Sequence, residues 1–266
     1  MKGVKTGAQV AELKAQARKR KLRAIRTRRR LRLLGIALIA AIAALGAWAL
    51  YNSHLFDVRE IEVRGNVRLA KDDIVDLSGV KKGQSLLKIS TGEVVDRVRK
   101  SPWVRSVRVT RRPPKTIEIE VAERQPFAVI AARGRLYYID DQGWVIDAVE
   151  EGGGSSLPRI VDLPLEAKIG RKIETDSLSN AIGCLKSLDQ DLRNQIASVS
   201  VPSSDKLLLY TKDGVEILYG RAEDVEKKNQ VIKAILAQKK GGKLIFMDVR
   251  TVTNPVVKRL DALYEQ

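Results

Sequence analysis

A stretch of 24 residues without a single Lys, Arg, Asp or Glu, from Leu33 to Phe56, constrains this chain more than any other feature. Its first 19 residues, up to Tyr51, are almost all Ala, Ile, Leu and Gly. A helix of about 20 apolar residues spans the hydrocarbon layer of a bilayer. Backbone polar groups in that layer must be paired within the segment itself, so the stretch predicts one transmembrane helix, which we place at 33–53.

The charges that flank this segment predict its orientation. Residues 1–32 hold thirteen Lys or Arg and a single acid, Glu12, which gives this tail a charge of +12 out of +17 for the whole chain. Basic flanks stay on the cytoplasmic side of a membrane, so we expect the residues after the span to lie outside the cytoplasm. The alternative is a cleaved signal peptide, since Ala47-Trp48-Ala49 has the form of a cleavage site. The lengths of the basic block and of the apolar stretch favour an uncleaved anchor.

A basic tail of this kind also raises the question of nucleic-acid binding. Here the tail adjoins the predicted span, where each Lys or Arg near anionic headgroups gains about 1 kcal/mol. The residues after the tail carry only the remaining +5. We therefore expect the tail to contact the membrane, and we expect no nucleic-acid partner.

After the span, the sequence predicts a strand, two helices and two further strands. Apolar and charged residues alternate over 56–66, which indicates a half-buried strand that ends in a Gly-Asn turn. A helical pattern covers 70–77, and Ser-Thr-Gly-Glu at 90–93 has the spacing of a capping box that opens a second helix. Alternating residues at 107–109 and 117–121 predict the last two strands.

The rest of the chain predicts a second domain of strands and helices. Tyrosine-rich and apolar segments flank a turn at 140–143. Later segments show the helical or alternating pattern expected of a helix at 175–188, a strand at 196–201, a hairpin at 207–219, a helix at 222–240 and a strand at 243–252. The single cysteine, Cys184, lies on the apolar face of the first of these helices, so we expect a buried structural thiol.

These segments, with the residues that carry them, resemble a known family. The residues are Phe56-x-Val58-x-x-Ile61-x-Val63-x-Gly65-Asn66, and then Val107-x-Val109 followed by Pro113/Pro114-x-Thr116-Ile117-x-Ile119-x-Val121-x-Glu123-Arg124-x-Pro126. In this order they resemble the POTRA domain of the bacterial cell-division family FtsQ, which is called DivIB in Gram-positive bacteria.

The resemblance implies an α+β fold with a single transmembrane helix, a β-α-α-β-β POTRA domain and a second, mixed and mainly antiparallel β-domain with packed helices. We expect a cytoplasmic basic tail at 1–32, the transmembrane helix at 33–53, the POTRA domain at 54–124, the FtsQ-type β-domain at 125–258 and a C-terminal tail at 259–266.

Nothing in the sequence selects a catalytic site. The only histidine, His54, lies at the predicted membrane boundary, and the chain has no Walker loop, metal-binding HExxH helix or glycine-rich dinucleotide turn. Acid pairs at 72–73 and 140–141 have ordinary roles at a helix start and in a turn. We expect no catalytic residue, no cofactor and no metal. Two rivals are a membrane-anchored cell-wall hydrolase that uses two carboxylates and a POTRA-containing assembly or secretion factor, whose barrel would need more strands.

The resemblance implies a non-catalytic scaffold of the divisome that links early and late division proteins. It implies a single-pass protein of the cytoplasmic (inner) membrane, concentrated at the division septum. Its expected partners are FtsB-type and FtsL-type proteins, paired as a coiled coil, with septal peptidoglycan synthase components as a further contact.

In this family the last strand of the β-domain receives a strand from the FtsB-type partner, a mode in which main-chain hydrogen bonds supply affinity. Mapped onto this sequence, that edge is 244–252, and the resemblance implies that Arg250 pairs with an acid of the partner. Some relatives place an aromatic residue directly after this Arg, where Thr251 stands here, so we expect Phe246 or Tyr219 to substitute. The predicted partner-binding residues are Leu244, Phe246, Asp248, Arg250, Thr251 and Tyr219. From the residues alone, core packing remains the alternative for Leu244 and Phe246, and a solvated strand charge remains the alternative for Arg250.

Overall fold

The structure, a computed structural model, describes residues 34–46, 48–51, 53–150, 156–163, 166–203, 205–238 and 242–260. The predicted basic tail, Ala47 of the alternative cleavage site and most of the predicted C-terminal tail lie outside the described residues.

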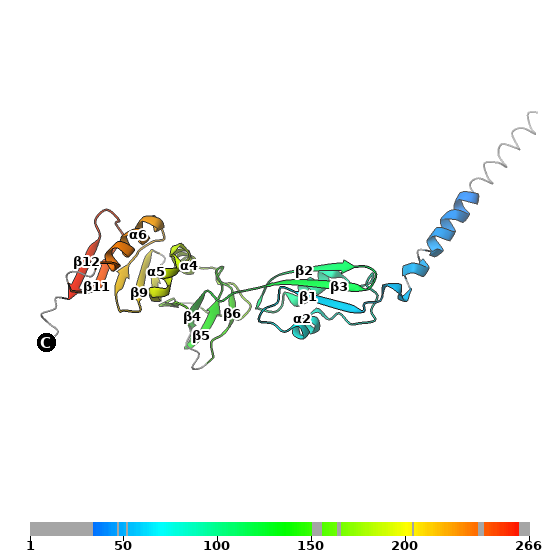
Figure 1. The fold of residues 1–266 in the computed structure, drawn as a ribbon, viewed down its shortest axis with the longest axis horizontal. Coiled ribbons are helices and arrows are strands. Elements are labelled where there is room, and N and C mark those ends of the chain that lie inside the picture. The colour runs from blue at the N-terminus through cyan, green and yellow to red at the C-terminus, as the bar shows by residue number, and fades with distance from the viewer. Residues whose placement is uncertain are drawn as a thin grey trace, which may run out of the picture. The chain divides into compact units, whose positions relative to one another are not determined.

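One apolar helix, Leu34–Tyr51, stands where the sequence predicts a span. It has 18 residues with a mean hydropathy of 2.1, none of the window is buried, and it is the one helix in the described part of the chain that is long and apolar enough to cross a membrane. The helix is drawn in blue in Figure 1. Just after it, the backbone N–H and the Oγ of Ser53 both donate to the carbonyl oxygen of Leu50, at 3.2 and 2.9 Å.

The elements that follow confirm the predicted β-α-α-β-β order. A short 3-10 helix, His54–Phe56, is followed by β1 (Glu60–Arg64), α2 (Lys71–Ser78), α3 (Thr91–Val98), β2 (Val104–Arg112) and β3 (Thr116–Glu123). The three strands form a sheet in the order β1-β3-β2. The predicted cap of α3 is present, because Ser90 Oγ accepts from the N–H of Glu93 at 3.4 Å.

The turn after β1 requires glycine. Gly65 has a φ of +78°, and a Cβ at this position would overlap the carbonyl oxygen of Val121 in β3. Only glycine combines a positive φ with such a close backbone approach. The Gly-Asn pair that the sequence predicts as the end of β1 is therefore fixed by the packing of β1 on β3.

The carboxylate of Glu123, at the end of β3, holds the loop that follows this turn. Its Oε1 accepts from the N–H groups of Val67 and Leu69 at 2.9 and 3.0 Å, and its Oε2 accepts from the N–H of Arg68 at 2.9 Å. Partial burial acts to raise the pKa of Glu123, but the three backbone donors together lower it below its usual value.

Replacing Glu123 by glutamine is expected to destabilise the fold at neutral pH and to have little effect in acid. Glutamine cannot accept all three charge-assisted hydrogen bonds, and partial exposure limits the cost to about 1–2 kcal/mol. Because the folded-state pKa lies below the unfolded value of about 4.3, this stability is present above that pH and is lost as the pH falls through the folded-state pKa. Thermal unfolding of the full chain in detergent at pH 7 and near pH 3 measures this stability. If the difference in thermal midpoint between Glu123→Gln and wild type does not shrink in acid, the Glu123 carboxylate does not stabilise the loop through its charge.

The second sheet contains nine strands among the described residues. They are β4 (Ala128–Ala132), β5 (Arg135–Ile139), β6 (Val145–Ala148), β7 (Arg159–Val161), β8 (Ile196–Ser203), β9 (Lys206–Thr211), β10 (Glu216–Leu218), β11 (Lys243–Asp248) and β12 (Val256–Leu260). Their order is β12-β11-β10-β9-β8-β7-β4-β5-β6. The pairs β10–β11, β7–β8 and β4–β7 are parallel and the other pairs are antiparallel. This confirms a mixed, mainly antiparallel β-domain.

Three helices pack with this sheet: α4 (Asp176–Ser187), α5 (Gln190–Gln195) and α6 (Val225–Leu236). Leu185 of α4 and Ile232 of α6 belong to one buried cluster with strand residues such as Val199 and Leu209. Cys184 is fully buried in the same cluster, as predicted, and desolvation raises the pKa of its thiol to about 12.

The described chain forms two compact units. The first contains the residues up to Glu60 together with 81–89 and 112–116, and the second contains 61–80, 90–111 and the residues from Ile117 onward. The predicted domain boundaries stay predictions, although β12 shows that regular structure continues past residue 258.

Candidate functional site

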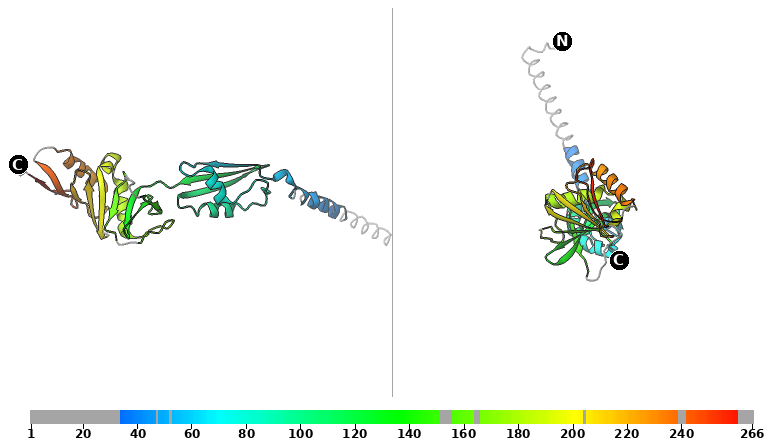
Figure 2. Two further views of the ribbon diagram at one scale, coloured as in Figure 1. Left: turned by 90° about the horizontal axis from the view of Figure 1, so that it is seen from below. Right: turned by 90° about the vertical axis from the view of Figure 1, so that its left-hand side faces the viewer.

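The outermost strand of the nine-stranded sheet, β12, has a free edge. It pairs antiparallel with β11, in a register that sets Val256 opposite Asp248, and no other described strand pairs with its far side. Figures 1 and 2 show β12, in red, at the rim of the sheet from several sides. Val256, Val257 and Leu260 are 51%, 43% and 44% exposed. An exposed edge strand carries unpaired N–H and C=O groups that can accept another strand.

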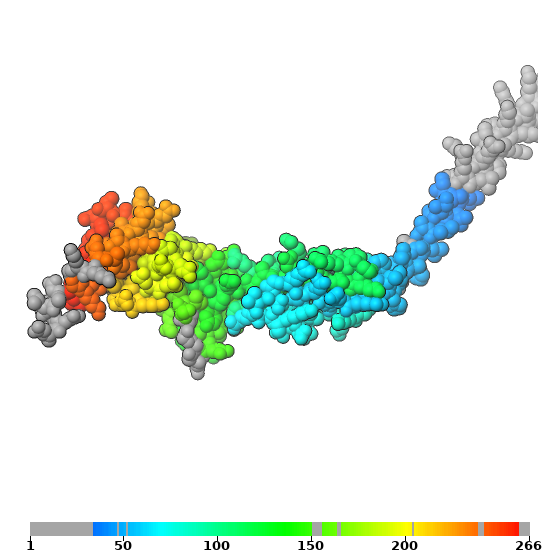
Figure 3. All heavy atoms as spheres, viewed as in Figure 1, coloured from blue at the N-terminus to red at the C-terminus, as the bar shows by residue number. Residues whose placement is uncertain are grey.

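The two faces of β12 differ. Val257 lies opposite the buried Met247, and Arg259 Nη1 donates to the carbonyl oxygens of Gln238 and Gly242, both at 3.2 Å, near the end of α6. On the other face, Lys258 lies opposite Phe246, with its Nζ 5.6 Å from the centre of the aromatic ring. In Figure 3 atoms of this end of the chain, in orange and red, are visible at the surface.

Asp248 and Arg250 form an ion pair at the end of β11. Arg250 Nη2 lies 2.7 Å from Asp248 Oδ2, its Nε lies 3.1 Å from Oδ1, and its backbone N–H donates to the same Oδ1 at 3.0 Å. The hydrogen bond from the Arg250 side chain lowers the pKa of Asp248 below its usual value. Within the described chain no hydrogen bond is made by Arg250 Nη1, and the Arg250 side chain is 59% exposed. The guanidinium is thus oriented by Asp248 and still presents a donor to solvent.

The aliphatic part of Arg250 rests on Gly220, since a Cβ at Gly220 would lie 3.0 Å from Arg250 Cγ. Lys228, a buried residue of α6, binds the backbone of the loop that contains Gly220. Lys228 Nζ donates to the carbonyl oxygens of Tyr219 and Arg221 at 3.1 and 2.8 Å, and burial lowers the pKa of this amine. The position of Arg250 therefore depends on a buried contact between α6 and the loop after β10.

The structure corrects the predicted edge. β11 lies between β10 and β12, so 244–252 is not a free edge, and the strand itself ends at Asp248. Arg250 and Thr251 lie in the turn that leads to β12, where the N–H of Asn254 donates to the carbonyl oxygen of Thr251 at 3.4 Å. The sequence pattern does not predict β12, because 256–260 does not alternate apolar and polar residues and both faces of this strand are largely exposed.

The other predicted site residues separate into surface and core. Phe246 and Leu244 are partly buried, and Leu244 packs against the core. Tyr219 is fully buried, and its hydroxyl donates to Asn229 Oδ1 at 3.2 Å. Tyr219 is therefore not available as a surface anchor, which corrects that expectation. The partner-binding role of the remaining residues stays a prediction.

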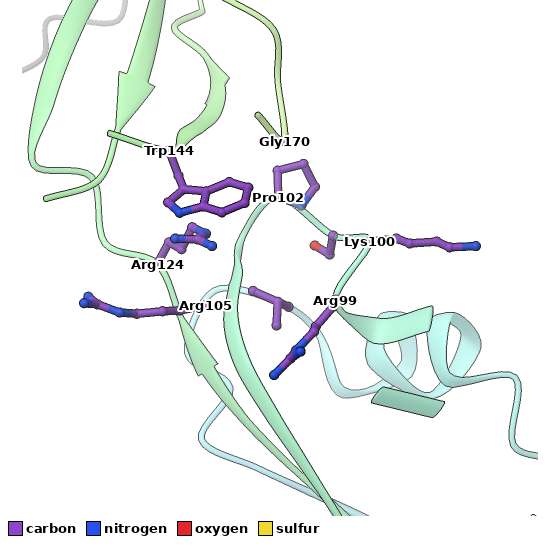
Figure 4. A pocket seen from close by; sticks show the side chains of 9 residues that line it. Arg99, Lys100, Pro102, Arg105, Arg124, Trp144 and Gly170 are labelled. Carbon is purple, nitrogen blue, oxygen red and sulfur yellow. The ribbon is translucent and has the colours of Figure 1, made fainter. Parts of the chain in front are cut away.

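A separate pocket of about 310 Å³ contains several basic side chains and one tryptophan. Figure 4 shows the Arg124 side chain against the ring of Trp144, while Lys100 extends away from both. The Arg124 guanidinium lies 4.3 Å from the Trp144 ring centre and 2.5 Å from Asp140 Oδ2, and Arg105 is paired with Asp141 at 3.2 Å. Two of the four cations that line the pocket are thus already neutralised by carboxylates.

Within the described ranges, no three His, Cys, Asp or Glu side chains form a group that could hold a metal ion.

Comparison with known proteins identifies the family. Residues 56–124 match the family model "POTRA domain, FtsQ-type", and residues 128–252 match "Cell division protein FtsQ/DivIB, C-terminal". The protein "Cell division protein FtsQ" of Anaeromyxobacter sp. (strain K) is 32% identical over 208 residues, which cover 75% of this chain and 70% of that protein. This chain belongs to the FtsQ/DivIB family. The protein "Cell division protein DivIB" of Clostridium acetobutylicum is 28% identical over 76% of this chain and 82% of its own length.

Among solved structures, the major extracytoplasmic domain of the cell division protein DivIB from Geobacillus stearothermophilus matches with 18% identity and a TM-score of 0.30. The match covers 44% of this chain and 93% of that domain. The FtsQ/DivIB assignment rests on the sequence matches, and β12 lies wholly after the second of them, which ends at residue 252.

Proposed function

We propose that this FtsQ/DivIB family member is a non-catalytic scaffold of the divisome that captures a strand of an FtsB-type partner at the free edge of β12. The helix Leu34–Tyr51 anchors the chain in the cytoplasmic membrane with its basic N-terminal tail inside and its folded units outside. The FtsB-type protein, paired with an FtsL-type protein, is concentrated with this chain at the septum. Contact with septal peptidoglycan synthase components links the complex to late division steps. The observation that carries the proposal is the unpaired outer side of β12.

The charges around this edge favour an acidic partner segment. Residues 243–260 contain four cations, Lys243, Arg250, Lys258 and Arg259, and one acid, Asp248, which is already paired with Arg250. Electrostatic complementarity steers association and fixes the register of the added strand. An extended segment with alternating apolar and acidic residues would match the exposed valines and the cations together.

Hydrogen exchange of the full chain in nanodiscs tests the proposal directly. On addition of the extracytoplasmic part of the FtsB-type and FtsL-type pair, the outward-facing amides of β12 are expected to exchange at least about tenfold more slowly, because they become part of a ladder. Binding of the pair with unchanged exchange throughout 256–260 would exclude strand addition at this edge.

Replacing Arg250 by glutamate is expected to weaken partner binding about tenfold, because the variant places two carboxylates side by side where the partner supplies a third. Lys172→Glu is a matched control, since Lys172 is also exposed and pairs with an acid two residues away, Glu174, at 3.3 Å. Titration of both variants with the same partner pair gives the two affinities. Equal losses for Arg250→Glu and Lys172→Glu would show a general charge effect and would remove Arg250 from the site.

A further inference from the structure

Three segments that are distant in the sequence meet in the first unit, directly after the apolar helix. Val58 forms two backbone hydrogen bonds with the loop 81–89. Its N–H donates to the carbonyl oxygen of Gln84 at 2.8 Å, and its carbonyl oxygen accepts from the N–H of Gly83 at 2.8 Å. The N–H of Arg59 donates to the carbonyl oxygen of Lys115 at 2.9 Å. The loop 81–89 and the turn 112–116 are therefore fixed beside the segment that leaves the helix.

These two segments carry only positive charges. They contain five cations and no acid, and the five are Lys81, Lys82, Lys88, Arg112 and Lys115. We call these five residues the juxtamembrane basic cluster. Lys81 and Lys82 are exposed and form no ion pair with any described residue, so their charges are not neutralised within the described chain.

One member of the cluster lies at the end of the apolar helix. Lys88 Nζ is 5.2 Å from the centre of the Tyr51 ring, and Tyr51 is the last residue of that helix. Tyrosines at the ends of membrane spans sit at headgroup level. The headgroup region on each side of a bilayer is about 5–8 Å thick, so the separation of Lys88 from this ring is comparable to the thickness of that region. Leu55, between the helix and β1, is 57% exposed and adds an apolar side chain at the same place.

We propose that the juxtamembrane basic cluster binds anionic phospholipid headgroups of the bilayer that holds the helix, and that this contact orients the first unit on the membrane surface. Lys and Arg side chains within about 8–10 Å of an anionic surface are attracted to it at physiological salt. The cluster adjoins the helix through the contact of Lys88 with Tyr51. This position favours phospholipid headgroups over the anionic polymers of the cell envelope as the ligand. The inference rests on the membrane anchor of the proposed function and is independent of strand capture at β12.

Headgroup quenching of a fluorophore in the loop tests the inference. The full chain, with Gln84→Cys labelled, is placed in nanodiscs of zwitterionic lipid or of lipid with about 30% anionic phospholipid, each with a headgroup-bound quencher. The native Cys184 is fully buried with a raised pKa, so it does not compete for the label. We expect quenching to be at least about twofold stronger in the anionic nanodiscs, and we expect this gain to disappear at about 0.5 M salt.

Lys81→Glu combined with Lys82→Glu is expected to abolish the gain in quenching. Lys206→Glu combined with Lys212→Glu makes the same charge change on exposed residues of the second unit and should leave the gain intact. Thermal unfolding of both double variants verifies that they fold.

Three outcomes would overturn the proposal. Equal quenching in the two lipids, in a chain that co-elutes with the nanodisc, overturns the lipid contact alone. If the fluorescence of the label at residue 84 changes on addition of soluble peptidoglycan fragments, and does not respond to anionic lipid, the cluster is reassigned to the cell wall. Failure of the chain to co-elute with the nanodisc overturns both this inference and the anchor of the proposed function, whereas the hydrogen-exchange result at β12 affects neither.

Discussion

Replacing Asp140 by alanine is expected to lower the free energy of unfolding of the second unit by about 3–5 kcal/mol, because it leaves a buried guanidinium without its counter-charge. The side chains of Asp140 and Arg124 are 1% and 8% exposed, and they meet at 2.5 Å. Asp140 Oδ1 also accepts from the N–H groups of Gln142 and Trp144, both at 2.9 Å, so the same change removes two bonds that hold the turn. With about 2–4 °C per kcal/mol for a unit of this size, the midpoint of thermal unfolding should fall by about 6–20 °C.

The neighbouring residue supplies the control for this prediction. Asp141 pairs with Arg105 and Lys186 at 3.2 and 3.1 Å, but its side chain is 34% exposed. Exposed ion pairs contribute about 0–1 kcal/mol, so Asp141→Ala should shift the midpoint only slightly. Adding Arg124→Met to Asp140→Ala should recover part of the loss, since no unpaired charge then remains buried. A loss as small for Asp140→Ala as for Asp141→Ala would refute the buried-pair account.

The sequence pattern Glu123-Arg124 is one of the motifs that carry the resemblance to the family, but it does not show what the two side chains do. The structure gives each a separate partner: Glu123 binds the backbone of 67–69, and Arg124 binds Asp140. The turn role predicted for the acid pair at 140–141 is confirmed for Asp140 by its bonds to Gln142 and Trp144. Its ion pair joins residues that are 16 positions apart. Local patterns do not encode a contact of that kind, because it depends on how the strands are packed.

Periodicity explains both what could be predicted in the nine-stranded sheet and what could not. The hairpin of β9 and β10 alternates clearly, and that alternation could also have shown that Tyr219 is buried, since it lies two residues after the buried Ile217. β12 has no such alternation, because four of its five residues are exposed and the strand has no single buried face. The free edge is therefore the part of the fold that sequence patterns describe least well.

A pair of proline variants in β12 should separate partner capture from folding. Along a strand the N–H groups of neighbouring residues point to opposite sides, so of Val257 and Lys258 one N–H faces β11 and the other faces outward. Proline removes the N–H and adds a bulky ring. At the outward-facing position it should weaken binding of the FtsB-type segment at least about 100-fold, or about 2.7 kcal/mol, with the thermal midpoint unchanged.

At the other position, proline should instead break the ladder between β11 and β12 and destabilise the second unit by about 3 kcal/mol. Val257→Ala and Lys258→Ala retain both N–H groups, so they separate the loss of a side chain from the loss of a backbone donor. Affinity for the partner pair and the thermal midpoint are measured on all four variants in detergent. If both proline variants bound the partner as the wild type does, the outer side of β12 would not be the surface that captures it, because an added strand cannot form its ladder past a proline.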